Sequence, residues 1–261
     1  MLSYIKDSFQ LTNKYIILAT PLILFSLLSS LYILFSVGGN LLSLLIALVL
    51  FGLMVGAFLS GWFFMIKTCV SNPEQEDPNV LLKEFPAGVG EYFLPVLGLM
   101  INTMVISVLL ILVSYFVGMK LIGDIGITPE ALTKGMESFT AMKAFLGSLT
   151  QEQLFKLNAW NMLLFFTMSV TYFLIMFYSP ALFFKEKNSF KAYFVSLKDL
   201  FSKKFFTNFG LFLILFVSYF ILSIFTTLFG ANVVTHFIFT LINFYFHIIF
   251  IVILKNKYGY K

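Results

Sequence analysis

The chain has 261 residues, of which 60% are hydrophobic and 11% charged, and its mean hydropathy is +0.96. A soluble domain carries roughly 25% charged residues, so this composition excludes an ordinary water-soluble fold and favours lipid as the solvent. The net charge is +5, every basic residue is lysine, and the single cysteine excludes both an intramolecular disulfide and a multi-cysteine metal site.

Long stretches without Lys, Asp or Glu predict where the chain crosses a membrane, because a spanning helix needs about 20 apolar residues. Four such stretches occur, and the turn signals Gly38-Gly39-Asn40 and Gly230-Ala231-Asn232 divide the first and the last of them. The sequence therefore predicts an all-α, polytopic membrane helical bundle that forms a single membrane domain over residues 1–261. Its six expected transmembrane helices cover about 15–37, 41–66, 93–119, 160–184, 205–229 and 233–254.

The distribution of lysine predicts the orientation of these helices. Both ends of the chain and the segments 67–91 and 185–204 fall on one side and carry 13 Lys against 8 Asp and Glu. The other side carries 4 Lys and 4 acidic residues, all within 120–156. Because basic loops remain in the cytoplasm, both termini are expected there.

Short amphipathic stretches precede the first, third and fifth expected spans. Leu2, Ile5 and Phe9 line one face of the N-terminal stretch, and a weaker stretch at 79–85 stops at Pro86. The clearest is 189–204, for which Ser189 is the expected N-cap. Lysines flank its apolar stripe and are expected to anchor it at the membrane interface: Lys191, Lys198, Lys203 and Lys204.

Residues 120–157 form an expected extracytoplasmic helical insert between the third and fourth spans. Thr128-Pro129-Glu130 combines an N-cap, a proline at the first helical position and an acid in the first turn. A second helix start is expected at Thr150. The insert is therefore predicted to contain two short helices that cap the outer face or rest on the membrane.

Small and polar residues predict how the spans pack. Gly52, Gly56 and Ser60 recur every four residues in the second span, a spacing that allows two helices to approach closely. A polar row on the third span is a candidate partner surface for the last span: Asn102, Thr103, Ser107, Ser114 and Gly118.

The last span carries a polar stripe, in which His236, Thr240, Asn243 and His247 follow Asn232 at helical spacing. The remaining residues are almost all aliphatic or aromatic, so the helix inserts and its stripe is expected to face other helices. The stripe has two interpretations: it relays protons or binds an ion or a lipid headgroup, or its side chains simply bridge helices.

The segment from Pro180 to Phe206 has a recognisable form, with an acid at Glu186 followed by an Ala…Ser-Leu helix at Ala192, Ser196 and Leu197. It resembles the joint between helices 4 and 5 in a group of bacterial six-helix inner-membrane proteins. That group includes the membrane domain attached to some glycerophosphodiester phosphodiesterases. The resemblance implies a fold and an inner-membrane location, and it implies no phosphodiesterase activity, because the catalytic domain of that family is separate.

No nucleotide-binding, metalloprotease or serine-hydrolase motif occurs, and no metal or cofactor is expected. The sequence favours a non-enzymatic module that binds lipid or a partner. The alternatives are the permease subunit of an ATP-driven exporter, with its ATPase on another chain, and an intramembrane lipid-modifying enzyme that uses a histidine. The expected partners are the lipid bilayer and a second copy of the chain or another membrane protein, and nothing indicates nucleic acid.

Overall fold

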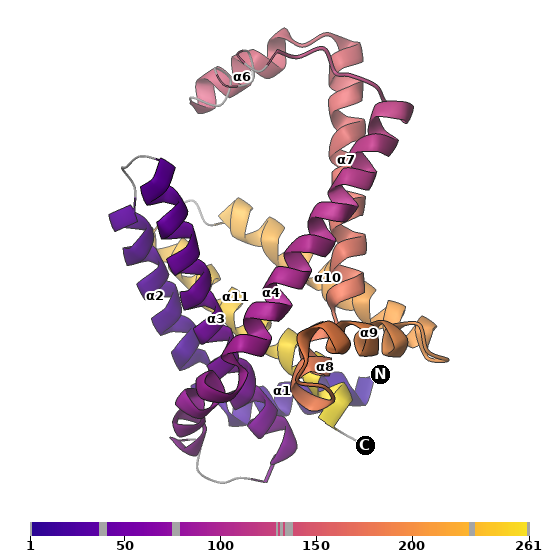
Figure 1. The fold of residues 1–261 in the computed structure, drawn as a ribbon. Helices are drawn as coiled ribbons and strands as arrows, with labels where there is room; N and C mark the ends of the chain where they lie inside the picture. Colours follow the sequence, from indigo (N-terminus) through magenta and orange to yellow (C-terminus); the bar gives the residue numbers. More distant parts are fainter. Residues whose placement is uncertain are drawn as a thin grey trace. The chain divides into compact units, whose positions relative to one another are not determined.

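The computed structural model describes residues 2–36, 41–74, 79–128, 130, 133, 138–229 and 233–259 (Figure 1). Every element assigned over these residues is helical. In chain order they are α1 (Leu2–Lys14), η1 (Ile16–Leu18), α2 (Ala19–Ser36), α3 (Leu41–Ser71), α4 (Asn79–Leu121), α6 (Phe139–Ser148), α7 (Gln151–Ile175), α8 (Tyr178–Phe184), α9 (Ser189–Leu200), α10 (Phe205–Phe229) and α11 (Val233–Gly259).

Six helical segments in the described part of the chain are long and apolar enough to cross a membrane. They are Ile16–Ile33, Leu42–Ser71, Val80–Leu121, Gln151–Phe184, Phe205–Phe225 and Phe237–Lys257. The predicted all-α polytopic membrane bundle is therefore confirmed. The predicted turns at 38–40 and 230–232 lie outside the described residues.

The third span is longer than its charge-free stretch. Helix α4 begins at Asn79, so the expected interfacial segment 79–85 is not separate, and Pro86 lies inside the helix instead of ending it. Lys83 and Glu91 sit in this first part of α4, and both are exposed. Helical hydrogen bonding does not require apolar side chains, so the helix extends past the charges that limited the prediction.

The fourth span is two helices. Helix α7 ends at Ile175 and α8 begins at Tyr178, two residues before Pro180. A proline ring clashes with the carbonyl four residues earlier, which is that of Met176 in the intervening turn. The break therefore follows from Pro180.

The chain divides into two compact units, residues 1–102 with 174–261 and residues 103–173. The second unit contains the end of α4, α6 and most of α7. Within it, the hydroxyls of Ser114 and Thr167 lie 2.5 Å apart, and the Trp160 indole N–H donates to the Gly123 carbonyl at 3.1 Å. These contacts hold its two long helical segments together.

The predicted second helix of the insert is part of α7. The Gln153 N–H donates to the Thr150 hydroxyl at 3.2 Å, and the Thr150 N–H donates to the Gln153 side chain at 3.1 Å. This reciprocal pair caps a helix that continues without interruption to Ile175. Helix α6 is capped by Ser138, whereas the predicted start at 128–130 includes Pro129, which lies outside the described residues.

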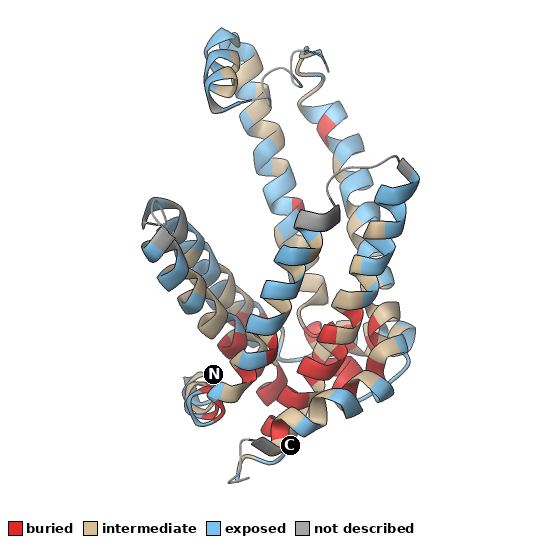
Figure 2. Cartoon of the chain, turned by 90° about the vertical axis from the view of Figure 1, so that its left-hand side faces the viewer, coloured by how far each residue is buried: buried red, intermediate tan, exposed pale blue. Residues whose placement is uncertain are grey.

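The core of the first unit gathers at one end of its helices, close to both termini (Figure 2). Fully buried side chains there include Trp62 and Met65 of α3, Tyr92 of α4 and Leu182 of α8. The Trp62 indole N–H donates to the Leu18 carbonyl at 2.9 Å, which fixes η1 against α3. This end is therefore packed like the interior of a soluble protein.

The N-terminal stretch is a helix, as the sequence predicts, but a different face of it is buried. Helix α1 packs against α11, and Ser8, Leu11 and Thr12 are buried, whereas Ile5 and Phe9 are only half-buried. The Asn256 side-chain amide donates to the Ser8 hydroxyl at 3.2 Å. The first and last helices of the chain are thus in direct contact.

Away from this core, large apolar side chains cover the helices. On α2 and α3, exposed residues include Leu27, Leu31, Ile46 and Val49. A soluble protein rarely exposes apolar patches of such extent. This surface is what a membrane-embedded bundle presents to lipid.

Candidate functional site

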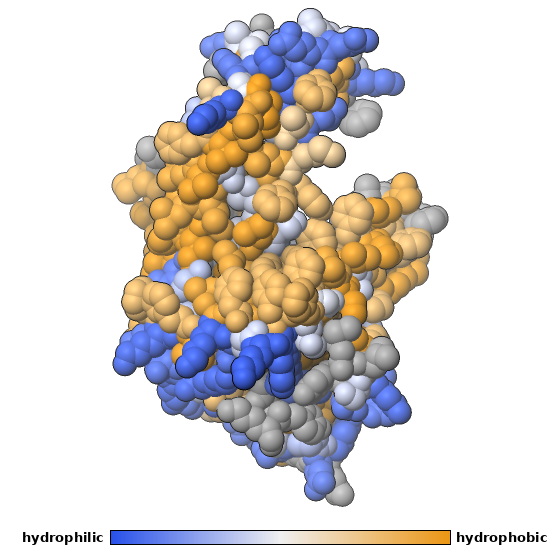
Figure 3. All heavy atoms as spheres, turned by 90° about the vertical axis from the view of Figure 1, so that its right-hand side faces the viewer, coloured by the Kyte–Doolittle hydropathy of each residue, from blue (hydrophilic) through white to orange (hydrophobic). Residues whose placement is uncertain are grey.

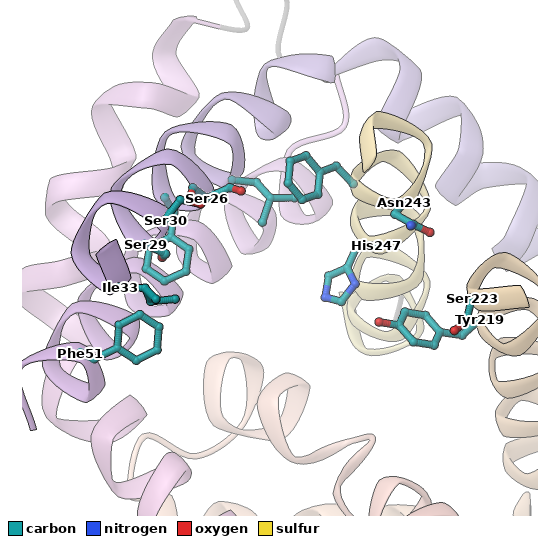
Figure 4. A pocket seen from close by; sticks show the side chains of 12 residues that line it. Ser26, Ser29, Ser30, Ile33, Phe51, Tyr219, Ser223, Asn243 and His247 are labelled. Atoms are coloured by element: carbon teal, nitrogen blue, oxygen red, sulfur yellow. The ribbon is translucent and has the colours of Figure 1, made fainter. Parts of the chain in front are cut away.

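A pocket of about 600 Å³ lies in the first unit among α2, α3, α10 and α11 (Figure 4). Its walls are largely apolar, and they are formed by Leu22, Phe25, Ile33, Phe51 and Phe244. Polar side chains from three of the four helices also reach it. We call this space the polar pocket; its polar lining residues are Ser26, Ser29, Ser30, Tyr219, Ser223, Asn243 and His247.

Helix α2 contributes three serines on one side of the polar pocket. The spacing of Ser26, Ser29 and Ser30 places them on the same helical face. The Ser30 hydroxyl donates to the Ser26 carbonyl at 2.9 Å, one turn back in its own helix. The Ser29 hydroxyl oxygen is shielded from solvent and has no hydrogen-bond partner among the described residues.

Helices α10 and α11 supply the other polar groups. Figure 4 shows Asn243 and His247 on α11, across the pocket from the serines of α2. The rings of Tyr219 and His247 meet edge to face, with centroids 6.2 Å apart. The pocket thus combines hydroxyl, amide and imidazole groups within an apolar wall.

The predicted stripe of the last span reaches the pocket only in part. Asn243 and His247 line it, whereas Thr240 is half-buried and lies outside the lining. His236 belongs to α11, but its side chain lies outside the described residues, as does all of Asn232. The sequence reasoning missed the serines of α2, although three hydroxyls at helical spacing in an apolar span were a readable signal.

The chemistry of the polar pocket is that of neutral hydrogen bonding. No Lys, Asp or Glu is among its described lining residues. No group of three or more potential metal ligands occurs in the described part of the chain. Neutral donors and acceptors within an apolar wall suit a molecule with uncharged polar groups and hydrocarbon, such as the glycerol and ester region of a lipid.

Two of the three predicted small residues of the second span, Gly56 and Ser60, lie at the contact between α3 and α4. A Cβ on Gly56 would meet the Leu97 side chain at 2.7 Å, and the Ser60 hydroxyl donates to the Gly56 carbonyl at 2.6 Å. Gly52, in contrast, has open space at that position. Two glycines that the sequence reasoning did not single out also lie here, since Gly61 faces Phe85 and Gly88 faces the Ser60 carbonyl.

The polar row of the third span has partners on α7 and α8. The Asn102 amide donates to the Tyr178 hydroxyl at 2.8 Å, Ser114 contacts Thr167, and Gly118 faces Trp160. The Ser107 hydroxyl returns to the Thr103 carbonyl of its own helix. The sequence suggested the last span as the partner of this polar row. In the structure, the described contacts of the row are with the fourth span.

A second group of polar atoms is enclosed in the core of the same unit. Lys255 of α11 is fully buried, and its ammonium nitrogen lies 4.1 Å from the ring centroid of Phe183 and 4.5 Å from that of Phe63. No hydrogen-bond partner for this nitrogen occurs among the described residues. The aromatic faces are therefore its main electrostatic contact.

Two further lysines surround the same rings. The Phe183 ring stacks on Tyr92 at 4.3 Å, and the Lys67 ammonium donates to the Tyr92 hydroxyl at 2.9 Å. Lys187 lies over Tyr92 and pairs with Glu91, and this hydrogen bond raises the pKa of the Lys187 ammonium. We call this group the lysine–aromatic cluster: Phe63, Lys67, Glu91, Tyr92, Phe183, Lys187 and Lys255.

The predicted last span ends at about residue 254, just before Lys255, because the charge-free stretch ends there. In the structure α11 continues to Gly259, and Lys255 is buried in the core. Its rings come from α3 and α8, distant in the chain, so the local sequence holds no sign of them.

The expected interfacial anchors lie on and just after α9. Lys191, Lys198, Lys203 and Lys204 are all exposed. The N-cap of α9 is Asn188, whose side chain accepts from the Lys191 N–H at 3.1 Å, and not the expected Ser189. The helix therefore starts one residue earlier than the expected N-cap implies.

The fold and the exposed apolar surface define a multi-pass helical membrane protein. Comparison of the chain with family models, with curated proteins and with solved structures finds no match. Its function therefore has to be inferred from its own residues.

Proposed function

We propose that the protein is a non-enzymatic lipid-binding module of the bacterial cytoplasmic membrane, with both termini in the cytoplasm. The polar pocket carries this proposal. Its volume of about 600 Å³ falls in the range of small-molecule sites, and its lining mixes apolar walls with a few neutral polar groups. A lipid would place hydrocarbon against Phe25 and Phe51 and its uncharged polar region against the serines and Asn243.

The unpartnered Ser29 hydroxyl supports an occupant. A shielded hydroxyl without a partner is unfavourable, and a lipid ester or hydroxyl would supply the missing hydrogen bond. Lysine asymmetry supports the orientation, since 13 of the 17 lysines fall on the side of the termini. The contact between α1 and α11 agrees with an even number of spans.

A transport subunit would also need a space among its helices. The neutral lining favours a lipid over an ion, because an ion leaving water would need charged or coordinating groups to replace its hydration shell. Co-purification of an ATPase from native membranes would instead favour the transport function. A single imidazole, without a carboxylate in the described lining, offers little for acid–base catalysis on a lipid.

The test is lipid retention. The protein is purified from native membranes, and the phospholipid and glycerolipid that remain bound are quantified by mass spectrometry for the wild type and for Ser30→Leu. The larger side chain projects into the polar pocket, so we expect bound lipid to fall severalfold. Equal retention in the two proteins would overturn the proposal.

Ser169→Leu is the matched control. Ser169 lies on α7, and its hydroxyl donates to the Phe165 carbonyl at 2.8 Å, as Ser30 does to Ser26. The substitution therefore removes the same kind of hydrogen bond and adds the same apolar volume at a residue that is not part of the pocket lining. We expect Ser169→Leu to retain lipid like the wild type.

A further inference from the structure

Helix α9 is held in place by one face. Ala192, Ser196 and Leu200 are buried and recur every four residues. The Tyr178 hydroxyl donates to the Ser189 carbonyl at 2.9 Å at the start of the helix. At its end, the Asn208 amide of α10 donates to the Asp199 and Leu200 carbonyls at 2.9 and 3.0 Å. The rotation of α9 about its axis is therefore fixed.

The opposite face of α9 presents an aromatic stripe. Phe190, Phe194 and Phe201 are 63%, 54% and 57% exposed. Their spacing of four and seven residues places them along one line of the helix. The Phe190 and Phe194 rings meet each other edge to face at 5.1 Å. Three exposed phenylalanines in a row on an ordered helix indicate a surface that water does not cover.

Positive charge lies beside this stripe. Lys191 and Lys198 are seven residues apart on one flank of the stripe, and Lys203 and Lys204 follow the helix. No ion pair in the described part of the chain involves any of these four lysines. The nearby carboxylate of Asp199 already pairs with Lys185 at 2.8 Å, which leaves the positive charge of the face uncompensated.

The position of α9 in the chain links this face to the membrane. The helix lies between the spans Gln151–Phe184 and Phe205–Phe225, so both of its ends are tied to the same side of the bilayer. Figure 3, which views the side of the molecule where α9 lies, shows a row of hydrophilic side chains directly beneath apolar ones. A helix tied at both ends to two spans lies within reach of the headgroup region.

We infer that the face of α9 formed by Phe190, Phe194 and Phe201 with Lys191 and Lys198 docks onto an anionic phospholipid surface. The rings enter the boundary between headgroups and acyl chains, and the lysine ammonium groups reach the lipid phosphates. Charge complementarity selects anionic lipid, because a neutral bilayer would satisfy the rings but not the lysines. This surface is separate from the polar pocket and does not depend on the lipid proposed there.

Site-directed spin labelling tests the inference. A nitroxide is attached at Phe194→Cys in a Cys69→Ala background and, as a control, at Lys187→Cys, which is exposed in the turn before α9. The full-length protein is reconstituted into vesicles of phosphatidylcholine alone or mixed with phosphatidylglycerol. Accessibility to oxygen, which concentrates in lipid, is compared with accessibility to a water-soluble nickel chelate.

In the anionic vesicles we expect position 194 to be open to oxygen and shielded from nickel, and position 187 to be open to nickel. Lys191→Gln with Lys198→Gln should weaken the binding of this face to anionic lipid by roughly fivefold for each lysine, measured as a rise in nickel access at position 194. Nickel access at 194 equal to that at 187 would overturn the inference. Shielding from both reagents would assign the face to a protein partner, and equal shielding in neutral vesicles would overturn the selectivity for anionic lipid.

Discussion

Two regions of the first unit place polar atoms among apolar side chains in opposite ways. In the lysine–aromatic cluster, the side-chain nitrogen of Lys255 is closely surrounded by rings and fully buried. In the polar pocket, neutral groups border an open space of about 600 Å³. Both regions contain polar groups, but only the polar pocket has empty volume beside them. The comparison teaches that this empty volume, more than the polarity of the groups, distinguishes a binding site from a structural contact.

The charge of Lys255 gives the largest expected effect. Lys255→Glu would bury a carboxylate against the negative faces of Phe63 and Phe183. An uncompensated buried charge costs about 3–5 kcal/mol, so we expect a much lower unfolding temperature in detergent. Lys255→Met gives an unbranched, uncharged side chain that is one heavy atom shorter, and should change stability by less than about 1.5 kcal/mol. Equal unfolding temperatures for Lys255→Glu and Lys255→Met would contradict the complete burial of Lys255.

Glycine substitutions test how tightly α3 and α4 pack against each other. A Cβ on Gly88 would press against Phe64 and come within 2.9 Å of the Ser60 carbonyl. Gly88→Ala should therefore destabilise the protein by about 1–3 kcal/mol, as overpacking does. Gly90, two residues along the same helix, has open space. Gly90→Ala should be neutral or stabilising by about 0.5–1 kcal/mol, and equal thermal shifts for the two variants would contradict this packing.

Ser29 gives the smallest expected effect and tests the pocket side of the comparison. Ser29→Ala removes a shielded hydroxyl without a partner, so in lipid-depleted detergent it should stabilise the protein by about 1 kcal/mol or less. On addition of a native lipid extract, the wild type should gain more in unfolding temperature than the variant. Ser169→Ala is the matched control, because its hydroxyl is already hydrogen-bonded. This variant should not be more stable than the wild type, and its unfolding temperature should rise as much as that of the wild type when lipid is added. If lipid raised the unfolding temperature of Ser29→Ala as much as that of the wild type, Ser29 would not contribute to lipid binding in the pocket.

The six spans could be predicted because lipid excludes charge, and charge is visible residue by residue. Their ends were less predictable, since a helix continues outside lipid wherever its backbone hydrogen bonds continue. Glu91 interrupts the hydropathy of α4 but not its helix. Pro180 marks the region of the break before α8, and the exact place of the break depends on the clash of its ring with the preceding turn.

The candidate site was predictable only where one helix carried the signal. Asn243 and His247 share a face of α11, and their spacing shows it. That this face meets Ser29 and Ser30 depends on α2 and α11 lying together, more than 200 residues apart in the sequence. The environment of Lys255 depends on rings from two other helices, so no local pattern could reveal it.

The contact between α1 and α11 has a consequence for the synthesis of the protein. Ser8 and Asn256 are separated by 248 residues, so the first helix meets its partner only when the last one has been made. At about 5–20 residues per second, this takes roughly 10–50 s. During that interval, the face of α1 that carries Ser8, Leu11 and Thr12 must be shielded by the insertion machinery, a chaperone or the headgroup layer. A nascent chain halted before α11 would keep this face exposed, and would thereby remain distinguishable from a finished molecule.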